Sequence, residues 1–336
     1  MIPNQIGSED KYKLSDDEEG DAGSQGSRSN LDANGADQKF SQHRIFVRRW
    51  RAVSFIQLAE WQRDNEYLHK WHRPAMPSVV TCFASIFRVH AETGNIWTHL
   101  LGAVFFIVYG TSFLSTPNSA FVNPAQEKLL FFGFFLGSTL CFSFSAIFHI
   151  MGDHSERLLR IFAKLDYSGI SFIITGGYIP SIYYEFYCEP TTMYMYSGLI
   201  MFLGVTCMVV SFSDKFGTPQ YRSTRAAVFV SLGLSGLFTE IQVAYEQGYE
   251  EALAVGRLEY LAVTAFLGVL GALLYACRIP EQFFPGQFDL VFQSHQLFHV
   301  LVLAAAVVHL FGLIRLQQHH FNNSDCSCKP TQRTRR

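Results

Sequence analysis

The sequence HQLFHVLVLAAAVVHLFGLIRL, residues 295–316, decides the fold class. Its only Lys, Arg, Asp or Glu is Arg315, next to the end of the stretch. A helix rises about 1.5 Å per residue, so these residues would extend for about 33 Å, enough to cross a hydrocarbon core of about 30 Å. The stretch therefore predicts a membrane-spanning helix.

Similar apolar stretches recur along the chain, separated by polar breaks that contain Pro, Gly or Asn. Together with 295–316 they predict seven transmembrane helices and an all-α membrane protein. The other six expected spans are 96–114, 127–149, 165–186, 192–212, 225–245 and 258–277.

The composition agrees with a membrane protein. Of 336 residues, 32 are Phe and 15 are Tyr, and only 16% are charged, which is unlike an ordinary soluble domain. The net charge of −2 provides no basic signature, so we expect no nucleic-acid partner. The seven cysteines have no regular spacing and imply no disulfide framework.

Three further regions flank or complete the predicted transmembrane domain at 96–318. Residues 1–43 are acidic and poor in apolar side chains, which predicts a disordered cytoplasmic tail. Residues 44–95 mix Arg with aromatic side chains and predict an amphipathic cytoplasmic segment with a short interfacial helix. A short helix packed on the loops of the bundle is the alternative for this segment. Residues 319–336 are expected to form a polar extracellular tail.

Loop charges predict the orientation. The loops after the second, fourth and sixth spans carry seven Lys and Arg residues, whereas the alternate loops carry two. By the positive-inside rule the N-terminus is cytoplasmic and the C-terminus is extracellular. The basic residues of the C-terminal tail oppose this assignment, but late charges weigh less in the rule.

Ionisable side chains are costly within a membrane, so their positions suggest function. His149 closes the second predicted span, Asp166 opens the third, and His295 opens the seventh with His299 one turn deeper. With the orientation above, all four lie at cytoplasmic helix ends.

These residues predict a metal site. His295 and His299 are four residues apart, so they share one helical face and can bind one ion. With His149 they would supply three nitrogen ligands and leave an open position for water, the arrangement of catalytic zinc. Asp166 could then orient or deprotonate that water, and Ser145 could donate to the water or to a developing oxyanion.

Two polar side chains near this site have simpler interpretations. A hydrogen bond from Ser145 to a backbone carbonyl of its own helix is the alternative to a catalytic role. For His99, within the first span, we expect a hydrogen bond to a neighbouring helix.

Several motifs, in order and spacing, resemble the progestin and adipoQ receptor family, specifically its adiponectin-receptor branch. The resemblance covers roughly residues 60 to 318. It is carried by ETGNIWTHLLG at 92–102, Ser145-x3-His149, KLDYSG at 164–169, RIPEQFFPGQFD at 278–289 and SHQLFHVLV at 294–302.

The resemblance implies a plasma-membrane receptor with seven helices and a cytoplasmic N-terminus, regulating lipid and fatty-acid metabolism. It also implies zinc on His149, His295 and His299, a water-mediated role for Asp166, and ceramidase-like cleavage of a lipid amide to a free fatty acid. The expected partners are a ceramide-like membrane lipid, an extracellular adiponectin-like protein and a cytoplasmic adaptor at the N-terminal region. Two alternatives remain open: a receptor with purely structural zinc that signals through cytoplasmic partners, and a sensor of bilayer composition.

Overall fold

The computed structural model describes residues 50–247 and 257–323. Within these ranges the chain forms helices and no strand, apart from an isolated antiparallel bridge between Val53 and His72. The all-α prediction is confirmed for this part of the chain. The predicted disordered tail at 1–43 and residues 324–336 of the predicted C-terminal tail lie outside the described residues.

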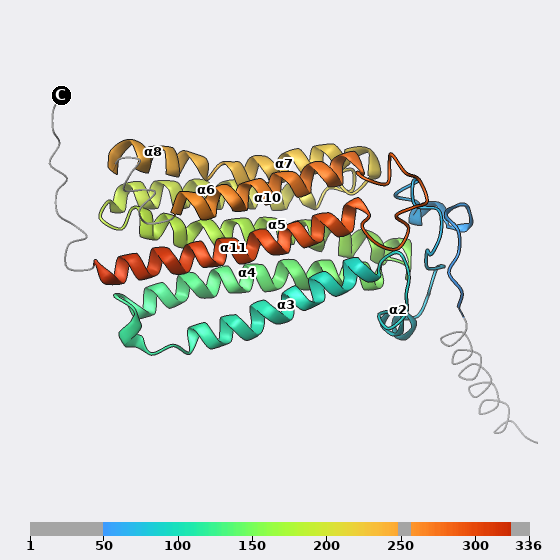
Figure 1. Ribbon diagram of the computed structural model, residues 1–336, viewed down its shortest axis with the longest axis horizontal. Coiled ribbons are helices and arrows are strands. Elements are labelled where there is room, and N and C mark those ends of the chain that lie inside the picture. The colour runs from blue at the N-terminus through green and yellow to red at the C-terminus, as the bar shows by residue number, and fades with distance from the viewer. Residues whose placement is uncertain (1–49, 248–256, 324–336) are drawn as a thin grey trace, which may run out of the picture. The chain divides into compact units, whose positions relative to one another are not determined.

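The long helices lie side by side and form a bundle (Figure 1). α4 packs against α3 and α5, α6 against α5 and α7, and α11 against α10, α3 and α5. The long helices are α3 (Thr93–Leu114), α4 (Pro124–Met151), α5 (Glu156–Glu185), α6 (Pro190–Ser211), α7 (Arg222–Leu234), α8 (Leu237–Gln247), α10 (Arg257–Cys277) and α11 (Ser294–Asn322). The short elements are η1 (Phe55–Gln57), η2 (Glu60–Gln62), α2 (Val79–Ser85), η3 (Asn118–Ala120) and η4 (Pro219–Tyr221).

Six segments of the described chain are long and apolar enough to cross a membrane, so the protein is a multi-pass membrane protein. They are Thr93–Leu114, Pro124–Met151, Pro190–Ser211, Pro219–Tyr245, Leu258–Cys277 and Ser294–Asn322. The expected third span falls in α5, which is not among the six and which carries Arg157, Arg160, Lys164 and Asp166 in its first three turns. α5 nevertheless packs between α4 and α6. A seventh span therefore stays a prediction.

The helix that contains the expected third span starts earlier than predicted. α5 begins at Glu156, well before the expected residue 165, because the Ser155 side chain caps its N-terminus by accepting a hydrogen bond from the Leu158 amide. An ion pair between Glu156 and Arg160, one turn apart, supports the charged first turns. Asp166 therefore lies in the third turn of α5 and not at its start.

The expected fifth span is interrupted. α7 ends at Leu234 and α8 begins at Leu237. A Cβ atom at Gly236 would lie only 1.9 Å from the Tyr178 ring, and the Tyr178 hydroxyl donates to the Gly233 carbonyl. The break therefore admits the Tyr178 side chain of α5 against the backbone.

Two regions outside the expected spans also differ from prediction. α11 continues to Asn322, so the first residues assigned to the polar tail are helical. They are held there because Gln317 donates to the Ala120 carbonyl at 2.8 Å and His320 is buried.

Cys188, in the turn between α5 and α6, is disulfide-bonded, although the cysteine spacing implied no disulfide.

Residues 50–92 lie against the end of the bundle where α4 ends and α11 begins (Figure 1). Arg73 is buried and donates to Asp153 Oδ2 at 2.7 Å and to the His149 carbonyl at 2.5 Å, which satisfies a carbonyl of the last turn of α4. The Asp289 carboxylate accepts from the His69 and Lys70 amides at 2.8 and 3.0 Å. These contacts are those of a segment packed on the loops of the bundle, and an interfacial position for α2 stays a prediction.

Close helix contacts set the position of α5 against α4. A Cβ atom at Gly137 would lie 2.6 Å from the Phe172 carbonyl oxygen, and one at Gly169 would lie 2.8 Å from Cys141 Cα. Small residues allow such backbone approach between membrane helices. The core beside this contact consists largely of aromatic side chains, including the fully buried Phe106, Phe131, Phe134 and Phe142.

Candidate metal centre

Three histidines from two helices meet at one end of the bundle. His149 lies in the last turn of α4, and His295 and His299 lie in the first two turns of α11. One ligand nitrogen from each can be chosen so that all lie within 4.8 Å of one another, and His149 Nε2 is 3.2 Å from His295 Nε2. The structure thus brings together the three histidines expected from the sequence, in a group that could hold a metal ion.

In two of these histidines, a hydrogen bond at Nδ1 leaves Nε2 available to bind a metal ion. His149 Nδ1 is 2.7 Å from Glu92 Oε2, and His299 Nδ1 is 3.1 Å from the Asn95 carbonyl oxygen. Since both partners are acceptors, each Nδ1 carries the proton and each Nε2 keeps a free lone pair. Neutral imidazole nitrogens suit zinc and other late first-row metals. The donor set therefore fits a metal ion.

Asp166 and Ser145 line the same cavity as His295 and His299. The group of metal-ligand atoms contains only the three histidines among the described residues, so Asp166 lies beside the group. The Ser145 hydroxyl is buried and lies next to the Asp166 carboxyl group. Ser138, two turns earlier, donates to the Phe134 carbonyl at 2.9 Å. Within the described residues, Ser145 does not form the backbone bond of this kind that was its alternative role.

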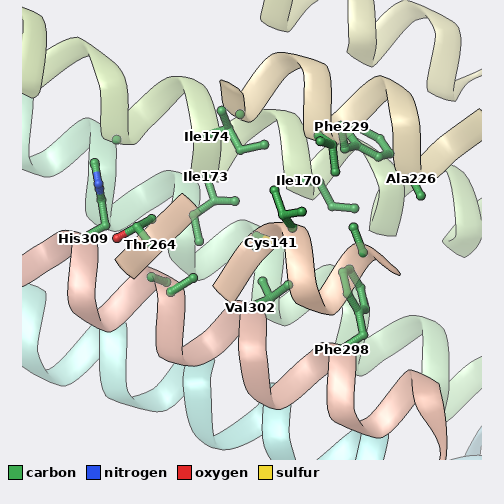
Figure 2. Close-up of a pocket in the computed structure, with 18 of the residues that line it drawn as sticks. Cys141, Ile170, Ile173, Ile174, Ala226, Phe229, Thr264, Phe298, Val302 and His309 are labelled. Atoms are coloured by element: carbon green, nitrogen blue, oxygen red, sulfur yellow. The ribbon is translucent and has the colours of Figure 1, made fainter. Parts of the chain in front are cut away.

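The cavity is apolar and about 220 Å³ in volume. Figure 2 shows Ile170, Ile173, Phe229 and Val302 around it, contributed by α5, α7 and α11. Along α11 its lining extends from His295 to His309, which are fourteen positions apart, or roughly 20 Å along the helix. Such a space suits an extended hydrocarbon chain.

A second cavity adjoins the first on the side of residues 50–92 and has charged groups in its lining, among them Asp64, Arg73 and Asp153. The histidine cluster lies where the two cavities meet, between a charged space and an apolar one. Five residues line both cavities: Asp166, Tyr167, Arg225, Tyr275 and His295.

The sequence interpretation did not include three contacts between the start of α3 and the histidine group. Glu92 and Asn95 contact two of the histidines, as described above. His99 stacks on His299 with ring centroids 3.6 Å apart, and both of its ring nitrogens are buried. His99 therefore contacts the neighbouring helix α11, and the expected hydrogen bond between the two helices stays a prediction. A sequence signal existed, because residues 92, 95 and 99 share one helical face.

Burial and neighbouring charged or polar groups shift the pKa values of two side chains just before α3. Burial raises the pKa of the Glu92 carboxyl group, but hydrogen bonds from His149 and Asn95 outweigh it and hold this pKa well below its usual range. Burial and the Arg73 cation lower the pKa of His90 to about 3. His90 Nε2 donates to the Ser85 carbonyl and Nδ1 accepts from the Glu92 amide, both at 3.1 Å. This neutral imidazole thereby fixes the backbone that precedes α3.

Known proteins resemble this chain over most of its length. Residues 87–310 match the family model described as haemolysin-III related. The chain is 43% identical to the adiponectin receptor protein of Drosophila melanogaster over 84% of this chain, and 45% identical to progestin and adipoQ receptor-like protein 1 of Caenorhabditis elegans over 80% of it. It spans 64% and 62% of the length of these two relatives. Heptahelical transmembrane protein 1 of Arabidopsis thaliana is 32% identical over 78% of this chain and 80% of its own length.

Proposed function

The chain belongs to the haemolysin-III related family, among adiponectin receptor and progestin and adipoQ receptor-like proteins, and from this we propose a zinc-dependent receptor that hydrolyses a lipid amide within its bundle. The substrate is ceramide or a related acyl amide, and the products are a free fatty acid and an amine. The receptor would regulate lipid and fatty-acid metabolism by this release.

One observation supports the proposal most strongly. The three-histidine group lies at the end of an apolar cavity whose lining also contains Asp166 and Ser145. A metal centre alone would need no apolar cavity, and a lipid cavity alone would need no cluster of imidazoles. Their combination suits hydrolysis of a polar bond on a long hydrocarbon chain.

Bound zinc would polarise the amide carbonyl and lower the pKa of a water molecule. We assign to Asp166, which lines the same cavity as two of the histidines, the role of accepting the proton of that water and returning it to the leaving amine. The Ser145 hydroxyl, next to Asp166, can donate to the oxygen that becomes negative during the attack. The buried ring of His99 offers a further polar contact in a mostly apolar lining.

We also propose a plasma-membrane location with the N-terminus in the cytoplasm and the C-terminus outside. The disulfide at Cys188 supports this orientation, because disulfides persist on the oxidising side of a membrane. The turn that contains Cys188 follows the third span and is one of the loops with few basic residues. An extracellular adiponectin-like protein and a cytoplasmic adaptor are the proposed protein partners.

A structural role for zinc is the second candidate. The histidine group joins α4 to α11, whereas α4 packs mainly against α3 and α5. A metal at this position would tie together two helices with little direct packing. Signalling would then pass through cytoplasmic partners, or the bundle would respond to bilayer composition.

The test uses purified protein in lipid nanodiscs supplied with ceramide. Fatty-acid release and zinc content are measured for wild type, Asp166→Asn and Asp214→Asn. Asp214 is an exposed carboxylate that pairs with Lys164, so Asp214→Asn is the matched control. Loss of release in Asp166→Asn alone, with zinc retained, supports the hydrolase. Equal release from all three proteins with zinc retained would refute the catalytic role of Asp166. No release from any of them, with zinc retained in all three, would refute the hydrolase and favour structural zinc.

A further inference from the structure

Glu92 directly precedes α3, but its side chain does not bond to the amides of that helix. Glu92 is the N-cap residue of α3, yet its side chain makes no capping hydrogen bond. Its Oε2 atom accepts from His149 Nδ1 at 2.7 Å and from Asn95 Nδ2 at 2.8 Å. The carboxylate is therefore directed at a histidine of another helix and held there by Asn95.

The next residues of the same turn contact the other helix of the metal group. The Asn95 carbonyl oxygen accepts from His299 Nδ1 at 3.1 Å, and Thr98 Oγ1 lies 3.4 Å from the same nitrogen. One turn of α3 thus orients an imidazole on α4 and an imidazole on α11.

This turn is fixed against α11. Gln293 Nε2 and Gln296 Nε2 both donate to the Ala91 carbonyl, at 2.8 and 3.2 Å. A Cβ atom at Gly94 would lie 2.7 Å from Gln296 Cδ, so the Gln296 side chain packs directly against the backbone of α3. The Glu92 carboxylate is consequently held in one place relative to both ligand-bearing helices.

A carboxylate on the far nitrogen of a ligand histidine has two physical effects. It holds the proton on Nδ1, which keeps Nε2 free, and its negative charge makes Nε2 a better donor to a cation. We propose that Glu92 is a positioning residue of the metal centre, and that its charge increases the affinity of the three-histidine group for zinc. This inference rests on the proposed zinc site, and it adds a role for α3, which contributes no ligand.

The experiment measures the zinc dissociation constant of the full chain in nanodiscs by competition with a chelator. Glu92→Gln keeps the size and an acceptor oxygen but removes the charge, and Glu92→Leu removes both. Glu189→Gln is the matched control, because Glu189 is likewise the N-cap residue of a long helix without a capping side-chain bond, and it is exposed. Loss of such an outer partner costs about 10–100-fold in metal affinity. We expect about 10-fold for Glu92→Gln, about 100-fold for Glu92→Leu, and no change for Glu189→Gln.

The thermal midpoint of the metal-free proteins separates positioning from folding. We expect Glu92→Gln to match wild type without zinc and to gain less stability than wild type when zinc is added. An unchanged dissociation constant in Glu92→Gln, whatever its midpoint, would overturn the inference. If the Glu92 variants do not fold, Asn95→Ala decides instead, because it removes the amide that holds the carboxylate: weaker zinc binding supports the inference and equal binding refutes it. Failure of wild type itself to bind zinc would refute the proposed zinc site, which is a separate outcome.

Discussion

The contact between α4 and α5 offers a sharp test of how the fold positions Asp166. Gly169 lies three residues after Asp166, so the two move together as part of one helix. A Cβ atom at Gly169 would lie 2.8 Å from Cys141 Cα, whereas ordinary contact begins at 3.4 Å. Because the opposing atom belongs to the backbone of α4, it cannot rotate away. Gly169→Ala should therefore separate the two helices locally by at least about 0.6 Å.

Gly169→Ala should lower the rate of lipid hydrolysis much more than it lowers the stability of the fold. Overpacking costs about 1–3 kcal/mol, and the better helix propensity of Ala returns about 1 kcal/mol, so the protein should still fold. A misplacement of about 1 Å can lower an enzymatic rate by about 10²-fold. We expect fatty-acid release to fall by roughly 10-fold or more, because Asp166 moves relative to the histidines. Zinc should remain bound, since all three proposed ligands lie on α4 and α11.

The assay is ceramide hydrolysis in nanodiscs, with zinc content and thermal midpoint measured on the same samples. Gly198→Ala is the matched control, because nothing lies within 4 Å of a Cβ atom at that position of α6. Release within about twofold of wild type in a zinc-loaded Gly169→Ala protein would show that the α4–α5 contact does not set the position of a catalytic Asp166.

Three further predictions concern topology, metal content and pH. A tag before residue 40 should be inaccessible to antibody in intact cells and one after residue 320 accessible; the opposite labelling would invert the orientation. Wild type should copurify with about one zinc per chain, and His295→Ala/His299→Ala should lose it; full zinc in that double variant would place the metal elsewhere. The pKa of His90 is lowered to about 3, so the unfolded chain, with its ordinary pKa near 6.5, takes up the proton first. The thermal midpoint should therefore fall as pH drops below about 6.5, and His90→Gln should lessen that fall; identical pH profiles would contradict the assignment.

The sequence determined those features that depend on residues close together along the chain. An apolar run of sufficient length predicts a membrane helix wherever it packs, and six of the predicted spans fall in helices that are long and apolar enough. The four-residue spacing of His295 and His299 places both on one helical face without knowledge of the neighbours. The family motifs likewise lie in continuous stretches.

Only the tertiary structure decided which faces meet. The charged residues before Asp166 suit either a loop or the exposed turns of a helix, so the start of α5 could not be fixed from them. The break at Gly236 depends on the Tyr178 ring, which comes from another helix. Glu92 and His149 are 57 positions apart, and nothing in the local sequence pairs them. Periodicity describes the faces of a single helix, whereas a hydrogen bond between helices depends on their relative rotation and depth, which the packing of the whole bundle sets.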